Sequence, residues 1–572
     1  MANKLQHSPK VVIIGLDGAG LETLETFCQQ GSLPQIQKLF QEGVAGKLTS
    51  IAPPITPAAW TSFMTGKNPG KHGLFDFIEL EDQSYNFRYT NARSRLSATL
   101  WESCNAAGFR VGLFNVPMTY PPDQLDGFVI SGMDSPDPES DFIHPPELRD
   151  ELVRQFGKME LDIRHLGFMT NDAVRSQVLD ELKAMETRRT EMFLHLLEHH
   201  PVDVAMLVFS ASDTVQHYFW HYQDPRHHWH ESVQGHAFAS AIQEVYSHLD
   251  EQIGRLLSAL SPETTIIIMS DHGAGGTGKD IFYLNRFLAQ EDFLSLKKSP
   301  NGAGRYYRRA LSILDGWLRG RLSSNQKAKL AYLFPWLRLR WEAAHSGLDL
   351  IDWPKTKAFG IEVLGFPSGI WVNLKGRFPH GVVNPGSEYD SLIADLKSHL
   401  LALEVDGRRL IPQVFHRDEL LDGPFREQAP DLILNWWEEG SIIPKPSFAS
   451  GITGPWREAV GSYSSLRAEW TGTHRLQGIV FLKGLPFLPQ TRLENAHILD
   501  LAPTLCYLLG VPIPDDFDGQ VLSQAFKQTY LENHRLSTQQ VPQTIRAKAE
   551  ATYTLSESDK IAARLKQLGY LE

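Results

Sequence analysis

The sequence Val11-Val12-Ile13-Ile14-Gly15-Leu16-Asp17-Gly18 is a continuous apolar run closed by an acidic residue and a glycine. Such a run is typical of a parallel strand that is buried on both faces. In open α/β sheets, ligands bind beyond the carboxyl ends of the strands, which is where Asp17 would lie. Asp17 could instead only begin a turn, because aspartate before glycine is common in turns. The stretch therefore predicts an α/β fold and leaves the role of Asp17 open.

A second apolar segment, Asp203–Ser210, is followed at once by potential ligands. If a helix begins near Ser212, Asp213 and His217 are four residues apart and share one face. A carboxylate and an imidazole so placed can hold one cation, although the same spacing occurs in ordinary helix-surface contacts. Further histidines follow within a short distance and could form either a metal-binding tract or a solvated polar loop, and we favour the loop: His221, His227, His228 and His230.

A third strand is predicted at Thr264–Ser270, and it ends in the pair Asp271 and His272 before a glycine-rich turn. Two adjacent ligand-type residues beyond a buried strand are hard to explain by core packing, which favours a functional role over a simple turn. His474 stands in a Gly/Thr-rich loop. Taken alone, a single histidine in such a loop is more often structural or exposed than a ligand.

The stretch Pro53–Trp60 contains Thr56 followed by Pro57. Threonine before proline predicts a helix N-cap with proline in the first turn. The Thr56 hydroxyl would then lie at the positive end of a helix, where an anion is favoured. A hydroxyl there could act as a nucleophile, but an ordinary cap explains an isolated Thr-Pro pair equally simply.

Composition narrows the class of protein. The 572 residues carry a net charge of −12, and 42% are hydrophobic. The negative charge argues against nucleic-acid binding, which usually requires a basic surface. Three cysteines, Cys28, Cys104 and Cys506, lie far apart, as expected in a reducing compartment. The polar segment Met1–Lys10 does not resemble a signal peptide, and no apolar run reaches membrane-spanning length, so we expect a cytoplasmic location.

One internal segment differs from the rest in charge. Residues 293–342 contain eleven Lys or Arg against Asp315 and Glu342, with aromatic and leucine residues interleaved. This pattern predicts an inserted basic amphipathic helical cap over residues 293–357. A solvated charged face is the simplest interpretation. The cap could alternatively guide an anionic substrate, contact an acidic membrane surface or bind nucleic acid.

The other boundaries follow from alternating strand and helix patterns. We predict a core formed by residues 1–292 and 358–526, and a polar C-terminal tail over residues 527–572. Further strands are predicted at Arg110–Val116, Gly127–Ser131, Gly369–Leu374, Asp431–Asn435 and Gly478–Leu482, and helices at Leu21–Glu42, 145–200, Glu388–Leu403 and His497–Leu509. Nothing in the sequence indicates an oligomeric state.

Carboxylates, imidazoles and one hydroxyl recur mostly where apolar strands end: Asp17, Thr56, Asp213, His217, Asp271, His272 and His474. Such a set suits two divalent cations, and without a thiolate it is compatible with Zn²⁺ or Mn²⁺. Two cations about 4 Å apart can activate a nucleophile and stabilise a leaving oxygen in phosphoryl transfer. The inventory therefore predicts a two-metal site.

These motifs resemble those of the alkaline phosphatase superfamily, in particular its type I phosphodiesterase/nucleotide pyrophosphatase branch. The order and separation of five motifs make the resemblance specific, although each is weak alone: Leu16-Asp17-Gly18, the Thr56 loop with Thr65-Gly66 and His72-Gly73, Asp213-x-x-x-His217, Ser270-Asp271-His272-Gly273, and Gly472-Thr473-His474. The resemblance implies a three-layer α/β sandwich with a mostly parallel central sheet and helices on both faces.

The resemblance also implies roles for these residues. Asp213, His217 and His474 would hold one divalent metal ion, and Asp17, Asp271, His272 and the Thr56 oxygen would hold the other. Zn²⁺ would be the first expectation and Mn²⁺ the alternative. Thr56 would attack the phosphorus of a small phosphate ester and form a phosphothreonine intermediate, which water would then hydrolyse.

The sequence departs from the family at two positions near Thr56. Ala59 and Phe77 stand where relatives carry an asparagine that helps to bind the phosphoryl oxygens. Removing one such donor can lower the rate about 10²- to 10³-fold, so we expect another group to replace it, for example one from the basic insertion. A phosphomonoesterase, a phosphonate hydrolase, a phosphomutase or a catalytically silent metal-binding protein therefore remain alternatives to a phosphodiesterase.

Overall fold

The computed structural model describes residues 4–297 (except 162, 164, 167, 168 and 170), 348–362, 369–447, 454–461, 470–540, 546 and 552–571. A sheet of nine strands forms its centre. Their order across the sheet is β22 (Thr491–His497), β2 (Val44–Thr49), β21 (Gln477–Lys483), β9 (Thr265–Met269), β1 (Val11–Leu16), β8 (Val204–Phe209), β5 (Val111–Val116), β6 (Gly127–Ser131) and β7 (Ile143–His144).

Most neighbouring strands of this sheet run parallel. β1 pairs in parallel with β8 and β9, β5 pairs in parallel with β6 and β8, and β2 pairs in parallel with β22. The antiparallel pairs lie toward the edges, where β21 joins β2 to β9 and β7 joins β6. The sheet is therefore mostly parallel, as predicted.

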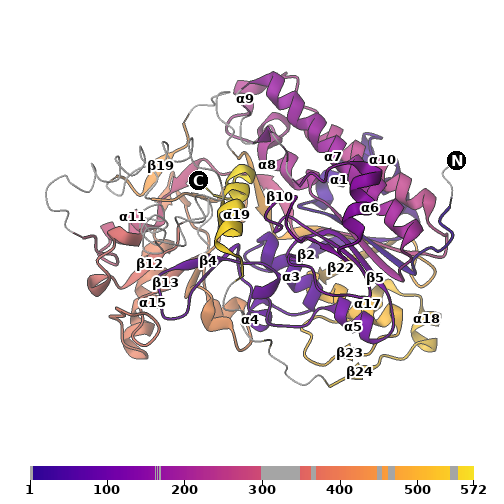
Figure 1. Ribbon diagram of the computed structural model, residues 1–572. Coiled ribbons are helices and arrows are strands. Elements are labelled where there is room, and N and C mark those ends of the chain that lie inside the picture. The colour runs from indigo at the N-terminus through magenta and orange to yellow at the C-terminus, as the bar shows by residue number, and fades with distance from the viewer. Residues whose placement is uncertain are drawn as a thin grey trace.

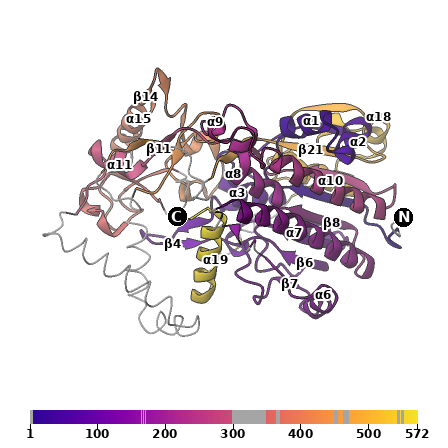
Figure 2. The ribbon, with the colours of Figure 1, turned by 90° about the horizontal axis from the view of Figure 1, so that it is seen from above.

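Helices cover both faces of the sheet (Figures 1 and 2). Alternate residues of β1 enter two different cores: Val12 and Ile14 pack into one, and Val11 and Ile13 into the other. A buried parallel strand has this property because successive side chains point to opposite faces. The first core includes α1 (Leu21–Gln29), α2 (Pro34–Glu42), α7 (Asp172–His199), α8 (Ala211–Gln223) and α10 (Ala241–Ala259), and the second includes α3 (Thr56–Thr65), α5 (Leu100–Ala106) and α17 (Leu501–Leu509).

Smaller sheets lie beside this sandwich. A two-stranded sheet pairs β10 (Gly273–Gly276) with β20 (Gly472–Arg475), at the end of the central sheet where β9 stops. A four-stranded sheet lies farther away with α11 (Leu284–Gln290) and α15 (Ser387–Leu401) beside it, at the left of Figure 1. Its strands are β12 (Ala358–Gly360), β13 (Ile370–Val372), β17 (Leu432–Leu434) and β16 (Val414–His416).

The prediction that Thr56 is a helix N-cap is wrong. Ile55 is the N-cap of α3, with extended backbone angles (φ −107°, ψ 127°). The reason is that the carbonyl of Ile55 accepts the first helical hydrogen bond, from the N–H of Ala59 at 2.9 Å. Thr56 is the first residue of the helix, and its side chain makes no capping bond. The Thr56 hydroxyl is therefore not used by its own helix.

Several other predicted elements differ from the structure in extent, and two predicted helices illustrate the causes. The helix predicted over Leu21–Glu42 is two helices, because Gly31 takes a left-handed conformation (φ +77°) and Pro34 begins α2. The helix predicted over His497–Leu509 begins only at Leu501, since His497 ends β22 and a 3₁₀ turn intervenes. Glycine and proline therefore interrupt the first prediction, whereas the second included the end of a strand.

The predicted tail is packed into the structure where it is described. Helices α18 (Gln528–Asn533) and α19 (Leu555–Leu568) lie within residues 527–572, and α19 (yellow in Figure 1) lies against the body of the protein. Tyr553, Ile561 and Leu565 are buried in the first core, which explains why this polar stretch does not remain extended.

The predicted basic cap over residues 293–357 lies largely outside the described residues, since 298–347 are not among them. The predicted membrane contact of residues 293–342 falls there as well. No helix in the described part of the chain is long and apolar enough to cross a lipid bilayer.

Candidate active site

The central strands place three predicted site segments at one edge of the sheet. Gly15 in β1 lies opposite Val208 in β8 and Met269 in β9, so these strands end at the same level. Asp17 follows β1, Asp213 lies in the first turn of α8 after β8, and Asp271 follows β9. The parallel register therefore gathers three carboxylates that are far apart in the sequence.

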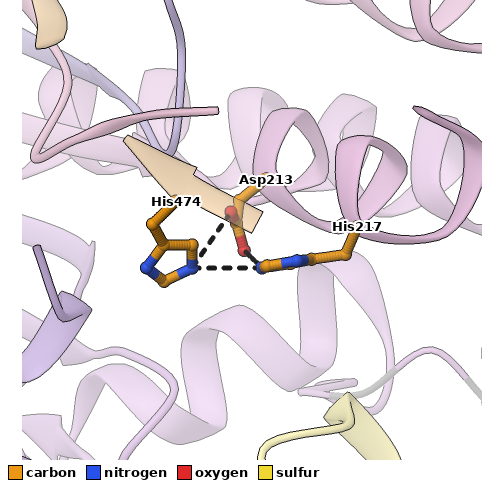
Figure 3. Close-up of side chains that lie close together, drawn as sticks. All are labelled: Asp213, His217 and His474. Atoms are coloured by element: carbon orange, nitrogen blue, oxygen red, sulfur yellow. Dashed lines mark hydrogen bonds and ion pairs between the residues drawn. The ribbon is translucent and has the colours of Figure 1, made fainter. Parts of the chain in front are cut away.

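One group of candidate metal ligands is formed by Asp213, His217 and His474 (Figure 3). The Nε2 atom of His217 lies 3.1 Å from Asp213 Oδ2 and 3.1 Å from the Nε2 atom of His474. His474 Nε2 lies 3.8 Å from Asp213 Oδ1. The first two residues share a face of α8, as predicted, and β20 brings in His474, which is buried rather than exposed. Two imidazole nitrogens and a carboxylate thus face one small volume.

A second group surrounds His272. Its Nε2 atom lies 3.3 Å from Asp271 Oδ2, 3.7 Å from Asp17 Oδ1 and 3.3 Å from Thr56 Oγ1. The rings of His272 and His474 are stacked, with centroids 3.7 Å apart, so the two groups form one site. Asp213 lies close enough to contribute to both groups. The structure therefore brings together all seven residues predicted from the sequence.

The three histidines present the same ring nitrogen to the site. Each Nδ1 atom lies at hydrogen-bonding distance from a backbone carbonyl: His217 from Gly472 (2.9 Å), His474 from Pro54 (2.7 Å) and His272 from Gly273 (3.0 Å). Because a carbonyl can only accept, each Nδ1 carries the hydrogen and each Nε2 is left with a lone pair. Metal-binding histidines are commonly oriented by such a contact.

The carboxylates of the site have buried oxygen atoms that lack hydrogen-bond partners among the described residues. Asp17 Oδ1, Asp213 Oδ1 and Asp271 Oδ2 are buried and accept no hydrogen bond from any residue in the described ranges. Burial, followed by the charges of Asp271 and Asp213, raises the pKa of Asp17 well above its ordinary value. Burial also raises the pKa of Asp271. Unpaired buried oxygens of mutually repelling carboxylates, beside imidazole lone pairs, fit divalent cations.

Backbone and side-chain contacts hold the ligands in place. The N–H of Gly18 donates to Asp271 Oδ1 (3.3 Å), and the Ser212 hydroxyl donates to the Asp17 carbonyl (2.7 Å). Gly18 adopts φ +66°, and a Cβ atom there would lie 2.7 Å from Asp213 Oδ1. Glycine is therefore required at this turn both for its backbone conformation and for the close approach of Asp213.

The prediction of a solvated polar loop is wrong for two of the four histidines, His221 and His227, which are buried, whereas His228 lies exposed in a turn. His221 lies within α8 and is 3% exposed, and His227 is 5% exposed. Burial lowers the pKa of His221 to about 2 and that of His227 to about 3. Helix α8 extends to Gln223 and so includes His221, and Trp229 packs its ring against both imidazoles. These histidines belong to the protein interior beside the site.

Two aromatic residues near the site were not found from the sequence. The ring of Trp470 stacks on that of His217, with centroids 3.6 Å apart. The ring of Tyr570, in the predicted tail, lies beside those of Trp470 and His217, with centroids 5.1 Å and 6.3 Å away. Neither residue stands in a motif, and no spacing links them to the others, so only the folded chain shows where they lie.

The two departures from the family pattern are also visible. Ala59 is fully buried in α3, and its methyl group offers no hydrogen bond. Phe77 is 5% exposed, and its ring lies against that of Tyr570, with centroids 4.6 Å apart. Neither position supplies a polar donor to the site.

The fold defines the class of protein: a three-layer α/β sandwich with a mostly parallel central sheet. A sequence profile of the type I phosphodiesterase/nucleotide pyrophosphatase family matches residues 11–446. The chain belongs to this family. His474 lies beyond the matched residues, and the fold brings it to the other ligands.

Solved structures with a similar fold include phosphonoacetate hydrolase from Sinorhizobium meliloti 1021 in complex with phosphonoformate. It is 13% identical, with a TM-score of 0.50 over 89% of this chain and 100% of that chain. Murine ectonucleotide pyrophosphatase/phosphodiesterase 5 is 13% identical, with a TM-score of 0.45 over 88% of this chain and 95% of that chain. At this identity the likeness concerns the fold alone. A search of curated proteins found no match.

Proposed function

We propose that the protein is a two-metal phosphohydrolase of the phosphodiesterase/pyrophosphatase type, with Thr56 as its nucleophile. The observation that carries the proposal is the position of the Thr56 hydroxyl, 3.3 Å from the Nε2 atom of His272. There it adjoins buried carboxylate oxygens that lack hydrogen-bond partners among the described residues. A hydroxyl so placed, at the first residue of a helix, is suited to nucleophilic attack on phosphorus.

The residues that would hold the cations follow from the two groups. Asp213, His217 and His474 would hold one, and Asp17, Asp271, His272 and the Thr56 oxygen the other, with Asp213 close to both. Zn²⁺ suits this set of nitrogen and oxygen ligands, and Mn²⁺ is the alternative. When bound, such cations lower the pKa of a coordinated hydroxyl or water and neutralise charge that develops on the phosphoryl group.

The reaction would proceed in two displacements. In the first, Thr56 Oγ1 loses its proton to water and forms a bond to phosphorus, while the bond from phosphorus to the leaving oxygen breaks and that oxygen takes a proton from water. In the second, water adds to phosphorus and the bond to Thr56 Oγ1 breaks, which releases the phosphate product and restores the hydroxyl. The N-terminus of α3 would stabilise negative charge on the Thr56 oxygen in both steps.

The proposal can be tested with purified protein supplied with Zn²⁺ or Mn²⁺. A panel of aryl phosphodiesters, phosphomonoesters, nucleotide pyrophosphates and phosphonates would define the substrate class. We expect hydrolysis of a phosphodiester, and a loss of at least about 10³-fold in kcat for Thr56→Ala and for Asp271→Asn. Thr65→Ala is the matched control, because Thr65 lies in the same helix and its hydroxyl only donates to the Thr61 carbonyl.

Two results would contradict the proposal. Unchanged activity in both Thr56→Ala and Asp271→Asn would remove these residues from the mechanism. A protein that binds no metal and hydrolyses nothing after reconstitution would indicate the alternative, a catalytically silent protein that retains the fold.

A further inference from the structure

The structure brings a side chain from the predicted tail to the proposed nucleophile. Helix α19 ends at Gly569, which adopts a left-handed conformation (φ +89°). The chain then turns back, so that the N–H of Tyr570 donates to the Leu565 carbonyl at 2.8 Å. A Cβ atom at Gly569 would lie 2.2 Å from Trp470 Nε1. Glycine therefore allows both the turn and the close packing that direct Tyr570 toward the site.

The ring of Tyr570 is fixed by aromatic neighbours and is 8% exposed. Its centroid lies 4.6 Å from that of Phe77, 5.1 Å from that of Trp470 and 6.3 Å from that of His217. The last two contacts are nearly perpendicular (84° and 82°), an arrangement that aromatic pairs favour. Phe77 is the residue that replaces the expected polar donor, and it serves here as a surface for the Tyr570 ring.

The hydroxyl of Tyr570 reaches the reacting centre. Thr56, Asp213 and Asp17 lie close to this hydroxyl. Tyr570 also lines a cavity of about 50 Å³ together with Asp17, Asp213 and His217. The hydroxyl therefore shares a small space with residues of both ligand groups.

The segment that carries Tyr570, residues 552–571, is anchored at several points. Arg564 donates to the carbonyls of Ser135 (2.5 Å) and Leu161 (2.7 Å). The Tyr553 hydroxyl donates to the Asp134 carbonyl (2.7 Å). These bonds join the segment to loops beside the central sheet, so the position of Tyr570 is set by the fold and not by a loose chain end.

We propose that the Tyr570 hydroxyl is a catalytic hydrogen-bond donor to a non-bridging phosphoryl oxygen, in place of the donors absent at Ala59 and Phe77. This assignment rests on the proposed function. A phenol is protonated at neutral pH and offers one hydrogen. When phosphorus bonds to Thr56 Oγ1, its other oxygens lie within reach of a donor already beside that atom. A fixed donor of this kind stabilises the charge of the transition state without reorganisation.

The test is Tyr570→Phe in the full chain, which keeps the ring contacts and removes only the hydroxyl. We expect kcat/KM to fall about 10²- to 10³-fold, the effect of removing one such donor. The midpoint of thermal unfolding and the metal content should stay unchanged. Vanadate, which adopts the five-coordinate geometry of the transition state, should lose affinity by a similar factor, whereas inorganic phosphate should lose less.

Tyr553→Phe is the matched control, because it removes a tyrosine hydroxyl that anchors the same segment away from the site. We expect it to leave kcat/KM and vanadate affinity within a few-fold of the wild-type values. If it lowers both as strongly as Tyr570→Phe does, docking of the segment explains the effect, and the assignment is wrong.

Other outcomes separate this assignment from the proposed function. An active wild-type protein with unchanged kcat/KM in Tyr570→Phe would overturn the assignment and leave the phosphohydrolase proposal standing. Higher activity in Tyr570→Ala would also overturn it, because the ring would then obstruct the substrate. A wild-type protein inactive toward every substrate would overturn the proposed function and this assignment together.

Discussion

At the scale of single residues, the site depends on which atom each side chain presents. In each of three histidines, the Nδ1–H donates a hydrogen bond to a backbone carbonyl, so the Nε2 atom points into the site: His217, His272 and His474. Burial and the neighbouring His272 lower the pKa of His474 well below its ordinary value, which keeps that imidazole neutral. A neutral imidazole with a free lone pair is the form that binds a metal ion.

His72 lies in the His-Gly motif that follows the Thr56 helix, and its role is structural. The N–H of Leu74 donates to its Nδ1 (3.2 Å), so its Nε2 carries the hydrogen and donates to the Ser62 hydroxyl (2.9 Å). Since Ser62 belongs to α3, His72 joins this helix to the chain that follows. Burial, with the charges of Arg95 and Lys67, lowers the pKa of His72 to about 3.

This pKa predicts a loss of stability in acid. The unfolded chain protonates His72 below about pH 6.5, whereas the folded chain does so only near the lowered pKa. Stability is thus fully present above pH 6.5, and the free energy of unfolding falls by about 1.4 kcal/mol per pH unit below it. Between pH 6.5 and pH 5, the free energy of unfolding measured with urea should therefore fall by about 2 kcal/mol through His72.

The contribution of His72 is isolated by comparison with variants. His72→Gln should be less stable at pH 7, and the difference from the wild type should shrink by about 2 kcal/mol by pH 5. His7→Gln, at an exposed histidine, should follow the wild-type curve. A constant difference between His72→Gln and the wild type across this range would show that the two states protonate His72 alike.

Residue types alone suggested much of the site. Asp17, Asp213, His217, Asp271 and His272 each follow an apolar strand, and this pattern is readable because strand ends in parallel sheets gather ligands. His474 became a candidate only through the family motif. Tyr570 lies in a polar, helical stretch where nothing distinguishes it, and its role depends on a turn at Gly569 that packs against Trp470.

At the level of secondary-structure elements, the glycine in the turn between β1 and α1 allows Asp213 to approach closely. We predict that Gly18→Ala will lower the metal content and the activity of the protein without unfolding it. The added methyl group would lie 2.7 Å from Oδ1 of Asp213, a residue that belongs to both groups of candidate ligands. Elemental analysis of purified protein and a phosphodiesterase assay measure the two effects.

Gly31→Ala is the matched control for this variant. Gly31 also has a left-handed conformation (φ +77°), but a Cβ atom there would meet nothing within 4 Å. Both variants bear the same backbone strain, of about 1–2 kcal/mol, whereas only Gly18→Ala should lose metal. Full metal content in Gly18→Ala would mean that Asp213 Oδ1 is not a ligand.

Strands were predicted more accurately than helix ends. The strand predicted at Gly127–Ser131 has the same bounds in the structure, and Asp203–Ser210 contains β8 with one extra residue at each end. Long apolar runs can form few other structures, which explains this accuracy. The predicted start of α3 was one residue off, because threonine before proline suits both the N-cap and the first turn of a helix. Only the hydrogen bond from the Ala59 N–H to the Ile55 carbonyl shows which of the two positions Thr56 occupies.

At the scale of the whole molecule, the site is assembled from segments spread over most of the sequence. The central strands β9, β1 and β8 are neighbours although they are distant in the chain, and β20 adds His474 from a later part. Spacing along the sequence carries no information on strand order. The grouping of these residues into one site was therefore predicted from the family resemblance and not from the residues alone. The packing of residues 552–571 against this framework had no counterpart in the sequence patterns.

The proposed mechanism requires that Thr56 carries the phosphoryl group during turnover. Rapid quenching of the metal-loaded protein with a phosphodiester, followed by mass spectrometry of its peptides, tests this claim most directly. We predict that Thr56 carries the phosphoryl group together with the ester group that has not left, that this adduct appears during turnover and disappears when substrate is exhausted, and that no such species forms in Thr56→Ala. Turnover without any phosphorylated residue, or with the phosphoryl group on another side chain, would contradict it.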